Sequence, residues 1–113
     1  MREFKFRQYI NGRYHYAFFA MKEHLGFPSV SHEIEQFTGL KDKNGKEIYE
    51  GDIVQSRSHN PANYLVGFVE GGFCCSWANG DGYPLDIAHF YDSTGCAIEV
   101  IGNIHENPKL LEL

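Results

Sequence analysis

Cys74, Cys75 and His89 are the residues that best fit nucleophilic catalysis, which needs a thiol or hydroxyl beside an oriented base. Neighbouring residues of a strand point to opposite faces, so we expect one of these cysteines to be buried and the other exposed. An exposed thiol near a histidine has a lowered pKa. Free cysteines are more often simple apolar core residues, however, and we predict no catalytic residue in this chain.

The six histidines raise the question of a metal site. None of them forms an HxH or HxxxH pair, none has a cysteine within two residues, and the chain contains no CxxC. Zinc sites normally show such paired spacing. Neither a GxxxxGK[ST] nor a GxGxxG phosphate-binding motif is present. We therefore predict no metal and no cofactor.

The segment 76–84 is the best candidate for a recognition surface, because a Trp and a Tyr bracket a Gly-rich tip. Interface energy concentrates on such rings, and loops on a rigid β scaffold commonly carry binding. The residues predicted to contact a partner are Trp77, Asn79, Asp81 and Tyr83. The alternative is that Trp77 belongs to the core and that the loop is only a connector.

Length and charge limit the classes of function. The chain has 113 residues, which is one domain, and its formal net charge is −5. An acidic chain is a poor match for the phosphate backbone, so nucleic acid is disfavoured as a partner. The alternative of a nucleic-acid module would use a platform of aromatic and basic residues: Arg7, Tyr9, Arg13, Tyr14 and Tyr16. The simpler interpretation of the N-terminal basic residues is a solvated strand face.

The cysteine content and the hydropathy of the chain indicate its cellular compartment. Three cysteines without paired spacing indicate free thiols and a reducing, cytoplasmic environment. Residues 1–7 are charged and lack the apolar core of a signal peptide. No apolar run approaches the roughly 20 residues that cross a bilayer, so we expect no membrane partner.

A β-hairpin is the clearest local element. Asn11-Gly12 is a preferred centre for a type I′ turn, where both residues need a positive φ. The flanking runs 3–10 and 13–19 are rich in aromatic residues, and a two-residue loop would place Phe6 opposite Ala17 and Tyr9 opposite Tyr14.

Short strands separated by turn signals follow the hairpin. They are expected at 34–40, 53–54, 64–70, 73–77, 85–91 and 96–104, with a turn or short helix at 107–113. A capped helix starting at Ser31 is the alternative for the first of them. Strands at intervals of roughly 8–12 residues favour a small barrel or sandwich. We predict a mainly β fold in a single domain, residues 1–113, with a hairpin and connector at 1–46 and a small SH3-like β-barrel at 47–107.

The residue types in segment 38–54 are typical of tight turns between strands, which would be a purely structural role. Asp42 and Asn44-Gly45 are typical of a turn in which Gly supplies a positive φ and a side chain bonds its own backbone. Gly51 lets the chain reverse at low steric cost, and Asp52 is placed to accept backbone N–H groups at that corner. The structural signature residues are Gly39, Asp42, Asn44, Gly45, Gly51 and Asp52.

The same segment, TGLKDKNGKEIYEGDIV, resembles the signature of the YopX family. The opening MREFKFR and the closing EVIGNIHENP, residues 1–7 and 99–108, also look like that family's ends. The resemblance implies a small protein of bacteriophages, prophages and other mobile elements, acting in the bacterial cytoplasm. It implies no activity and no ligand-binding residues. Segments 14–33 and 56–97 do not match the family pattern.

The sequence therefore favours a non-enzymatic binding or assembly protein. We expect self-association as one mode of action and a host or phage protein as another partner. The nucleic-acid module and a small enzyme with a Cys/His site remain the alternatives.

Overall fold

The computed structural model describes residues 4–18, 33–56, 62–69, 71–77, 85–92 and 95–111, without the side chains of residues 17, 18, 77 and 92. Short strands dominate this part of the chain. The elements are β1 (Lys5–Ile10), β2 (Arg13–Phe18), β3 (Glu35–Lys41), β4 (Glu47–Tyr49), β5 (Asp52–Ser56), β6 (Ala62–Val69), β7 (Gly72–Trp77), β8 (Leu85–Asp86), the 3-10 helix η1 (Ile87–Phe90), β9 (Tyr91–Asp92), β10 (Gly95–Cys96), β11 (Ile98–Asn103) and the 3-10 helix η2 (Pro108–Leu111).

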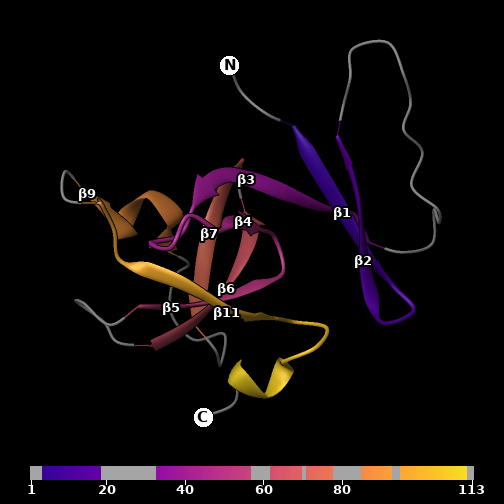
Figure 1. Ribbon diagram of the computed structural model, residues 1–113. Helices are drawn as coiled ribbons and strands as arrows, with labels where there is room; N and C mark the ends of the chain where they lie inside the picture. Colours follow the sequence, from indigo (N-terminus) through magenta and orange to yellow (C-terminus); the bar gives the residue numbers. More distant parts are fainter. Residues whose placement is uncertain are drawn as a thin grey trace.

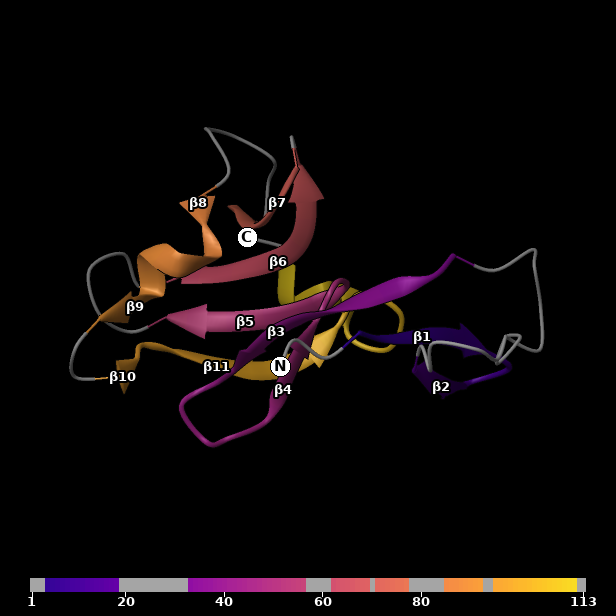
Figure 2. The same ribbon diagram turned by 90° about the horizontal axis from the view of Figure 1, so that it is seen from above.

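The strands form two main antiparallel sheets. One has the order β2-β1-β3-β4, the other has the order β11-β5-β6-β7-β8, and β9 and β10 pair separately. The hairpin β1–β2 stands beside the rest of the strands as an arm in both views, while the five-stranded sheet curls around the core (Figures 1 and 2). This arrangement confirms the mainly β prediction, and the SH3-like topology stays a prediction.

The N-terminal hairpin has the predicted turn and register. Asn11 and Gly12 have φ values of 51° and 82°, as a type I′ turn requires. Phe6 lies opposite Ala17, and Tyr9 lies opposite Tyr14. β1 then pairs with β3 over only two positions, so side chains must supply most of the attachment of the arm.

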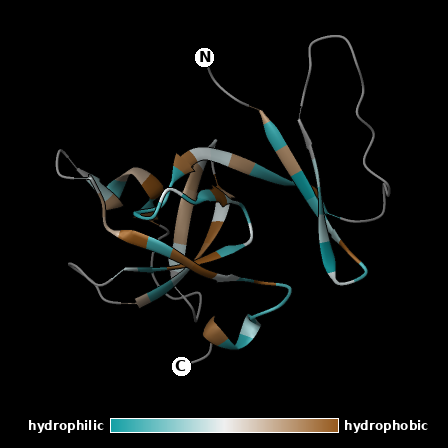
Figure 3. Cartoon of the chain, viewed as in Figure 1, coloured by the Kyte–Doolittle hydropathy of each residue, from teal (hydrophilic) through white to brown (hydrophobic). Residues whose placement is uncertain are grey.

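We call the part of the structure outside the β1–β2 arm the body. Its core is built from alternating residues of the curled sheet. Tyr64 and Val66 of β6 point inward with Cys75 of β7, and η1 closes one end with Ile87 and Phe90. The remaining core members are Ile48, Val54 and Ile98. Ile48 and Val54 come from segment 38–54, so this segment supplies core side chains as well as turns, and Figure 3 shows β11 as mostly hydrophobic.

Two local predictions hold and one is wrong. The run 34–40 forms β3, as favoured over the helix alternative, and a short 3-10 helix occupies 108–111. The predicted continuous strand at 85–91 is broken by η1. Asp86 explains the break, because its carboxylate accepts the N–H of Ala88 at 2.9 Å and so caps a helical turn within the apolar run.

In the part of the chain that the structure describes, no helix is both long enough and apolar enough to span a membrane.

Candidate functional site

The predicted recognition loop falls almost wholly outside the described residues. Asn79, Asp81 and Tyr83 lie beyond them, and Trp77 is placed only as the last backbone position of β7. Contact of these four residues with a partner therefore stays a prediction.

The predicted turn at Asp42 is present and reaches further than expected. The Asp42 Oδ1 atom accepts the N–H groups of Asn44 at 2.8 Å and Lys46 at 2.9 Å. Its Oδ2 atom accepts the N–H of Val100 on β11 at 2.9 Å. Gly45 follows with a φ of 83°. One carboxylate therefore fixes the β3–β4 turn and also ties it to a strand 58 residues away.

A second signature corner lies between β4 and β5. Gly51 has a φ of 86°, and its N–H donates to Val66 O while its carbonyl accepts the N–H of Ile104. The Asp52 Oδ2 atom accepts the N–H of Tyr49 at 2.8 Å, as predicted for this corner. The corner therefore connects β4, β5, β6 and the end of β11.

The other oxygen of Asp52 belongs to a buried ion-pair network around Arg7 of β1. Arg7 Nη2 donates to Asp52 Oδ1 at 2.8 Å and to the Glu50 carbonyl at 3.1 Å, and Arg7 Nε donates to Glu35 Oε1 at 2.7 Å. Arg7, Glu35 and Asp52 are each 5% exposed or less. The expectation that the basic N-terminus forms a solvated strand face is therefore wrong for Arg7.

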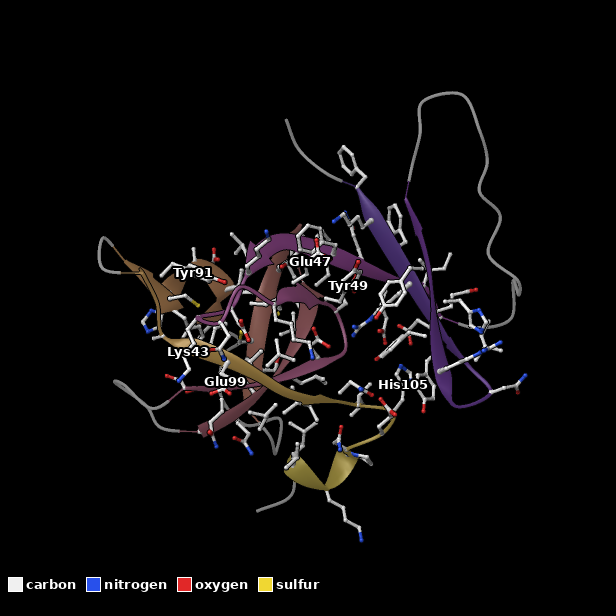
Figure 4. The ribbon with its side chains drawn as sticks, in the orientation of Figure 1. Lys43, Glu47, Tyr49, Tyr91, Glu99 and His105 are labelled. Carbon is white, nitrogen blue, oxygen red and sulfur yellow. The ribbon has the colours of Figure 1, made fainter. Side chains whose placement is uncertain are left out.

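Aromatic rings enclose this network. The guanidinium carbon of Arg7 lies 3.9 Å from the ring centroid of Tyr14 and 4.5 Å from that of Tyr49, within the range of cation–π attraction. His105 stacks on Tyr9 with centroids 4.6 Å apart and a 2° interplanar angle. Tyr49 and His105 lie between the body and the arm in Figure 4.

His105 completes the network from the end of the chain. Its Nε2 atom lies 2.7 Å from Glu35 Oε2, so Glu35 contacts Arg7 with one oxygen and His105 with the other. We call Arg7, Glu35, Asp52 and His105 the Arg7 cluster. Two carboxylates face one guanidinium, which leaves one negative charge in excess, and a protonated His105 would neutralise it.

Burial governs the protonation of this region. It lowers the pKa of Arg7 by itself, but Asp52 and Glu35 outweigh that effect, so the guanidinium stays charged. Burial raises the pKa of Tyr49 to about 12 and raises the pKa of Tyr14 further still. Both phenols are therefore neutral over the physiological range. Burial also raises the pKa of the Asp52 carboxyl, and the neighbouring Arg7 acts in the opposite direction.

The three segments on which the family resemblance rests meet at this cluster. Arg7 lies in 1–7, Asp52 in 38–54 and His105 in 99–108, while Glu35 lies just outside the second segment. The residue pattern predicted Asp52 at a corner but did not predict the cluster itself. A signal was present, because Arg7 shares one face of the hairpin with tyrosines that favour burial.

The expected aromatic and basic platform is split between two faces of the arm. Tyr9, Tyr14 and Tyr16 share one face with Arg7, as the register requires, whereas Arg13 pairs with Ile10 on the other face. That first face packs on the body through Tyr49 and the Arg7 cluster. Arg7 is therefore committed to two carboxylates instead of being displayed for a phosphate.

The Cys/His alternative requires an exposed thiol near His89, which is itself exposed on η1. Cys74 and Cys75 are both buried, at 6% and 0% exposure, so the prediction of one exposed thiol is wrong. Cys75 lies in the core, and Cys74 is small enough to be covered on the opposite face, where it pairs with Gly67. Burial raises the pKa of Cys75 to about 12, which opposes formation of a nucleophilic thiolate.

Within the described residues, no group of three or more His, Cys, Asp or Glu side chains is arranged to hold a metal ion.

The fold and this cluster define a small β protein whose N-terminal arm is locked to a curled-sheet body. Residues 3–112 match the YopX protein family model, and the chain belongs to the YopX family. The chain is also similar to the crystal structure of protein EF1440 from Enterococcus faecalis, with 30% sequence identity and a TM-score of 0.50. That match covers 96% of this chain and 75% of the other. No curated protein matches the chain.

Proposed function

We propose that this YopX-family chain is a non-enzymatic accessory protein of a phage, prophage or other mobile element that acts by binding protein surfaces in the bacterial cytoplasm. The partner is a second copy of the chain or a host or phage protein. An SH3-like topology of the body would suit such a role, because a small rigid β scaffold holds its loops in place for binding.

One observation carries this proposal: large apolar side chains remain exposed, whereas the charged residues of the Arg7 cluster are buried and hold the arm on the body. The exposed residues are Phe4, Tyr16, Ile34, Phe68 and Val69, with 45–62% of each accessible. Tyr16 lies on β2, and Phe68 and Val69 lie on β6, while Phe4 precedes β1 and Ile34 precedes β3. Exposed aromatic residues favour contact with other proteins, since their burial yields more free energy than that of polar groups.

The alternative partner, nucleic acid, gains less support from these contacts. Arg7 is buried, and Lys5 is paired with Glu47 at 2.5 Å. Phosphate binding by Arg7 or Lys5 would have to break these ion pairs, whereas contacts to protein would use the apolar residues as they stand.

Affinity capture from bacterial lysate tests the proposal. Tagged wild-type protein, a Tyr16→Ser/Phe68→Ser variant and a Lys109→Ala control would be compared by quantitative mass spectrometry. We expect the wild type and the control to retain the same protein in near-stoichiometric amount, and the double variant to lose it. Absence of both captured protein and self-association would refute the binding function, as would capture that the double substitution leaves unchanged.

A further inference from the structure

Strand β2 is the outer strand of the arm. In the sheet order β2-β1-β3-β4, the described residues pair β2 with β1 alone. A sheet edge offers a row of N–H and C=O groups that can add another strand. The second side of β2 is therefore the place where the arm can extend its sheet.

The turn fixes which backbone groups face outward. A two-residue type I′ turn makes Ile10 and Arg13 a hydrogen-bonded pair, and such pairs alternate along an antiparallel ladder. Arg13, His15 and Ala17 therefore direct their N–H and C=O groups to β1. Tyr14, Tyr16 and Phe18 direct theirs to the outer edge.

The sequence of this edge lacks the features that protect natural edges. Residues 14–18 read YHYAF, with no Lys, Glu, Asp or Pro. Charged residues, proline and bulges are the usual means of blocking edge pairing, and the register of β1 with β2 is continuous through all six pairs. Tyr16, at the middle of this stretch, is 62% exposed.

We propose that β2 pairs antiparallel with β2 of a second copy of this chain about a two-fold axis at Tyr16. This inference rests on the proposed binding function and names its partner. In this register Tyr16 lies opposite Tyr16 of the partner subunit, and Tyr14 lies opposite the partner's Phe18. The three hydrogen-bonded pairs exchange about six backbone hydrogen bonds, and the two four-stranded sheets become one continuous sheet.

Charge and symmetry favour a second copy as the occupant. A two-fold axis at Tyr16 places His15 opposite Ala17, so no like charges face each other along residues 14–18. The basic residues of β1 do not oppose the approach, because Lys5 is paired with Glu47 and Arg7 with Glu35 and Asp52. Aromatic residues from both copies then face each other across the axis, where cross-strand aromatic pairs stabilise a sheet.

Substitution at the axis gives a specific test. Tyr16→Lys places two like charges directly opposite each other in the dimer, and Tyr16→Glu does the same with the other sign. Light scattering coupled to size exclusion would give the mass of each variant alone and of the two mixed. Ala88→Lys is the control, because it adds the same charge at an exposed position on η1 of the body, away from β2.

We expect dimers for the wild type and for Ala88→Lys, monomers for each Tyr16 variant alone, and restored dimers when the two variants are mixed. Circular dichroism of the monomeric variants would check that the arm and body stay folded. A monomeric wild type at high micromolar concentration would overturn the inference, as would folded Tyr16→Lys protein that still dimerises. Wild-type monomers that capture a partner from lysate would leave the proposed function standing, so the two failures are distinguishable.

Discussion

Arg7 on β1 and Asp52 on β5 form a buried ion pair, with 2.8 Å between Nη2 and Oδ1. The pair joins the arm to the body across 45 residues of sequence. The same guanidinium contacts Glu35, and only a planar group with several fixed donors can serve two carboxylates and a carbonyl in this way.

Replacing Arg7 by Met should be strongly destabilising. The substitution leaves Glu35 and Asp52 buried without their cation, and breaking a buried pair in this way costs about 3–5 kcal/mol. Urea denaturation would measure the loss. Arg13→Met on the exposed turn of the same hairpin is the control, and it should change stability by less than about 0.5 kcal/mol. Equal effects of the two substitutions would contradict a locking role for Arg7.

Gly51→Ala and Gly45→Ala separate backbone strain from steric conflict. Both glycines have positive φ, of 86° and 83°, so each substitution should cost about 1–2 kcal/mol. A Cβ on Gly51 would also overlap the carboxylate of Glu35, whereas a Cβ on Gly45 meets nothing within 4 Å. We therefore expect a clearly larger loss for Gly51→Ala in thermal unfolding, and similar losses would show that Glu35 yields freely.

Asp42→Ala should release the β3–β4 turn from β11. The substitution removes the acceptor for three backbone N–H groups, including that of Val100, and a hydrogen bond to a charged group contributes about 1.5–3 kcal/mol net. Hydrogen exchange would show faster exchange of the Val100 amide. Asn44→Ala, on the exposed part of the same turn, should leave that amide protected, and unchanged exchange in Asp42→Ala would refute the link.

Glu50→Gln should stabilise the protein slightly at neutral pH. Burial raises the pKa of Glu50, and nearby Glu35 adds to that effect, so the folded state holds the Glu50 proton more tightly than the unfolded state. The wild type therefore loses stability as the pH rises above the ordinary pKa of a Glu side chain. It regains that stability on acidification through the folded-state pKa of Glu50.

The gain from Glu50→Gln should be about 0.5 kcal/mol, because Glu50 is only partly buried and solvent screens its charge. It should shrink as the pH approaches 4, and the amide keeps an oxygen for the N–H of Gln36. Thermal unfolding across pH 4–8 would follow both effects. Glu47→Gln is the control and should not stabilise, since Glu47 is paired with Lys5. A gain that grows on acidification would contradict a raised pKa for Glu50 in the folded protein.

Thiol labelling should distinguish the three cysteines. Cys96 is partly exposed, while Cys74 and Cys75 are buried and the pKa of Cys75 is raised to about 12 by that burial. In folded protein we expect one fast-reacting thiol with Ellman's reagent at pH 8, and three in urea. Cys96→Ser should abolish the fast phase, and a persisting fast phase would mean that β7 opens readily.

Local chemistry was predictable from the sequence, and long-range pairing was not. The Asn11-Gly12 turn and the Asp42 turn depend on residues within a few positions, so their types and spacing were enough. The Arg7 cluster depends on contacts between distant residues. Glu35 is 28 residues from Arg7, and His105 is 70 residues from Glu35. No short spacing encodes such contacts.

Burial was the second property that alternation alone could not predict. A strand pattern assigns Cys74 and Cys75 to opposite faces, but it does not say that both faces are covered. Likewise, a basic residue on an N-terminal strand suggests solvent exposure, and Arg7 is buried only because two acids and two rings from other strands surround it. The prediction of Trp77 as a contact residue lies outside the described side chains.

The stack of Tyr9 on His105 has a consequence for synthesis on the ribosome. The arm is synthesised well before His105, which follows Tyr9 by 96 residues in the sequence. Until then the tyrosine-bearing face of the nascent hairpin lacks its final cover. A prematurely terminated chain that stops before residue 105 would carry this open face, which would mark it for degradation by cellular proteases.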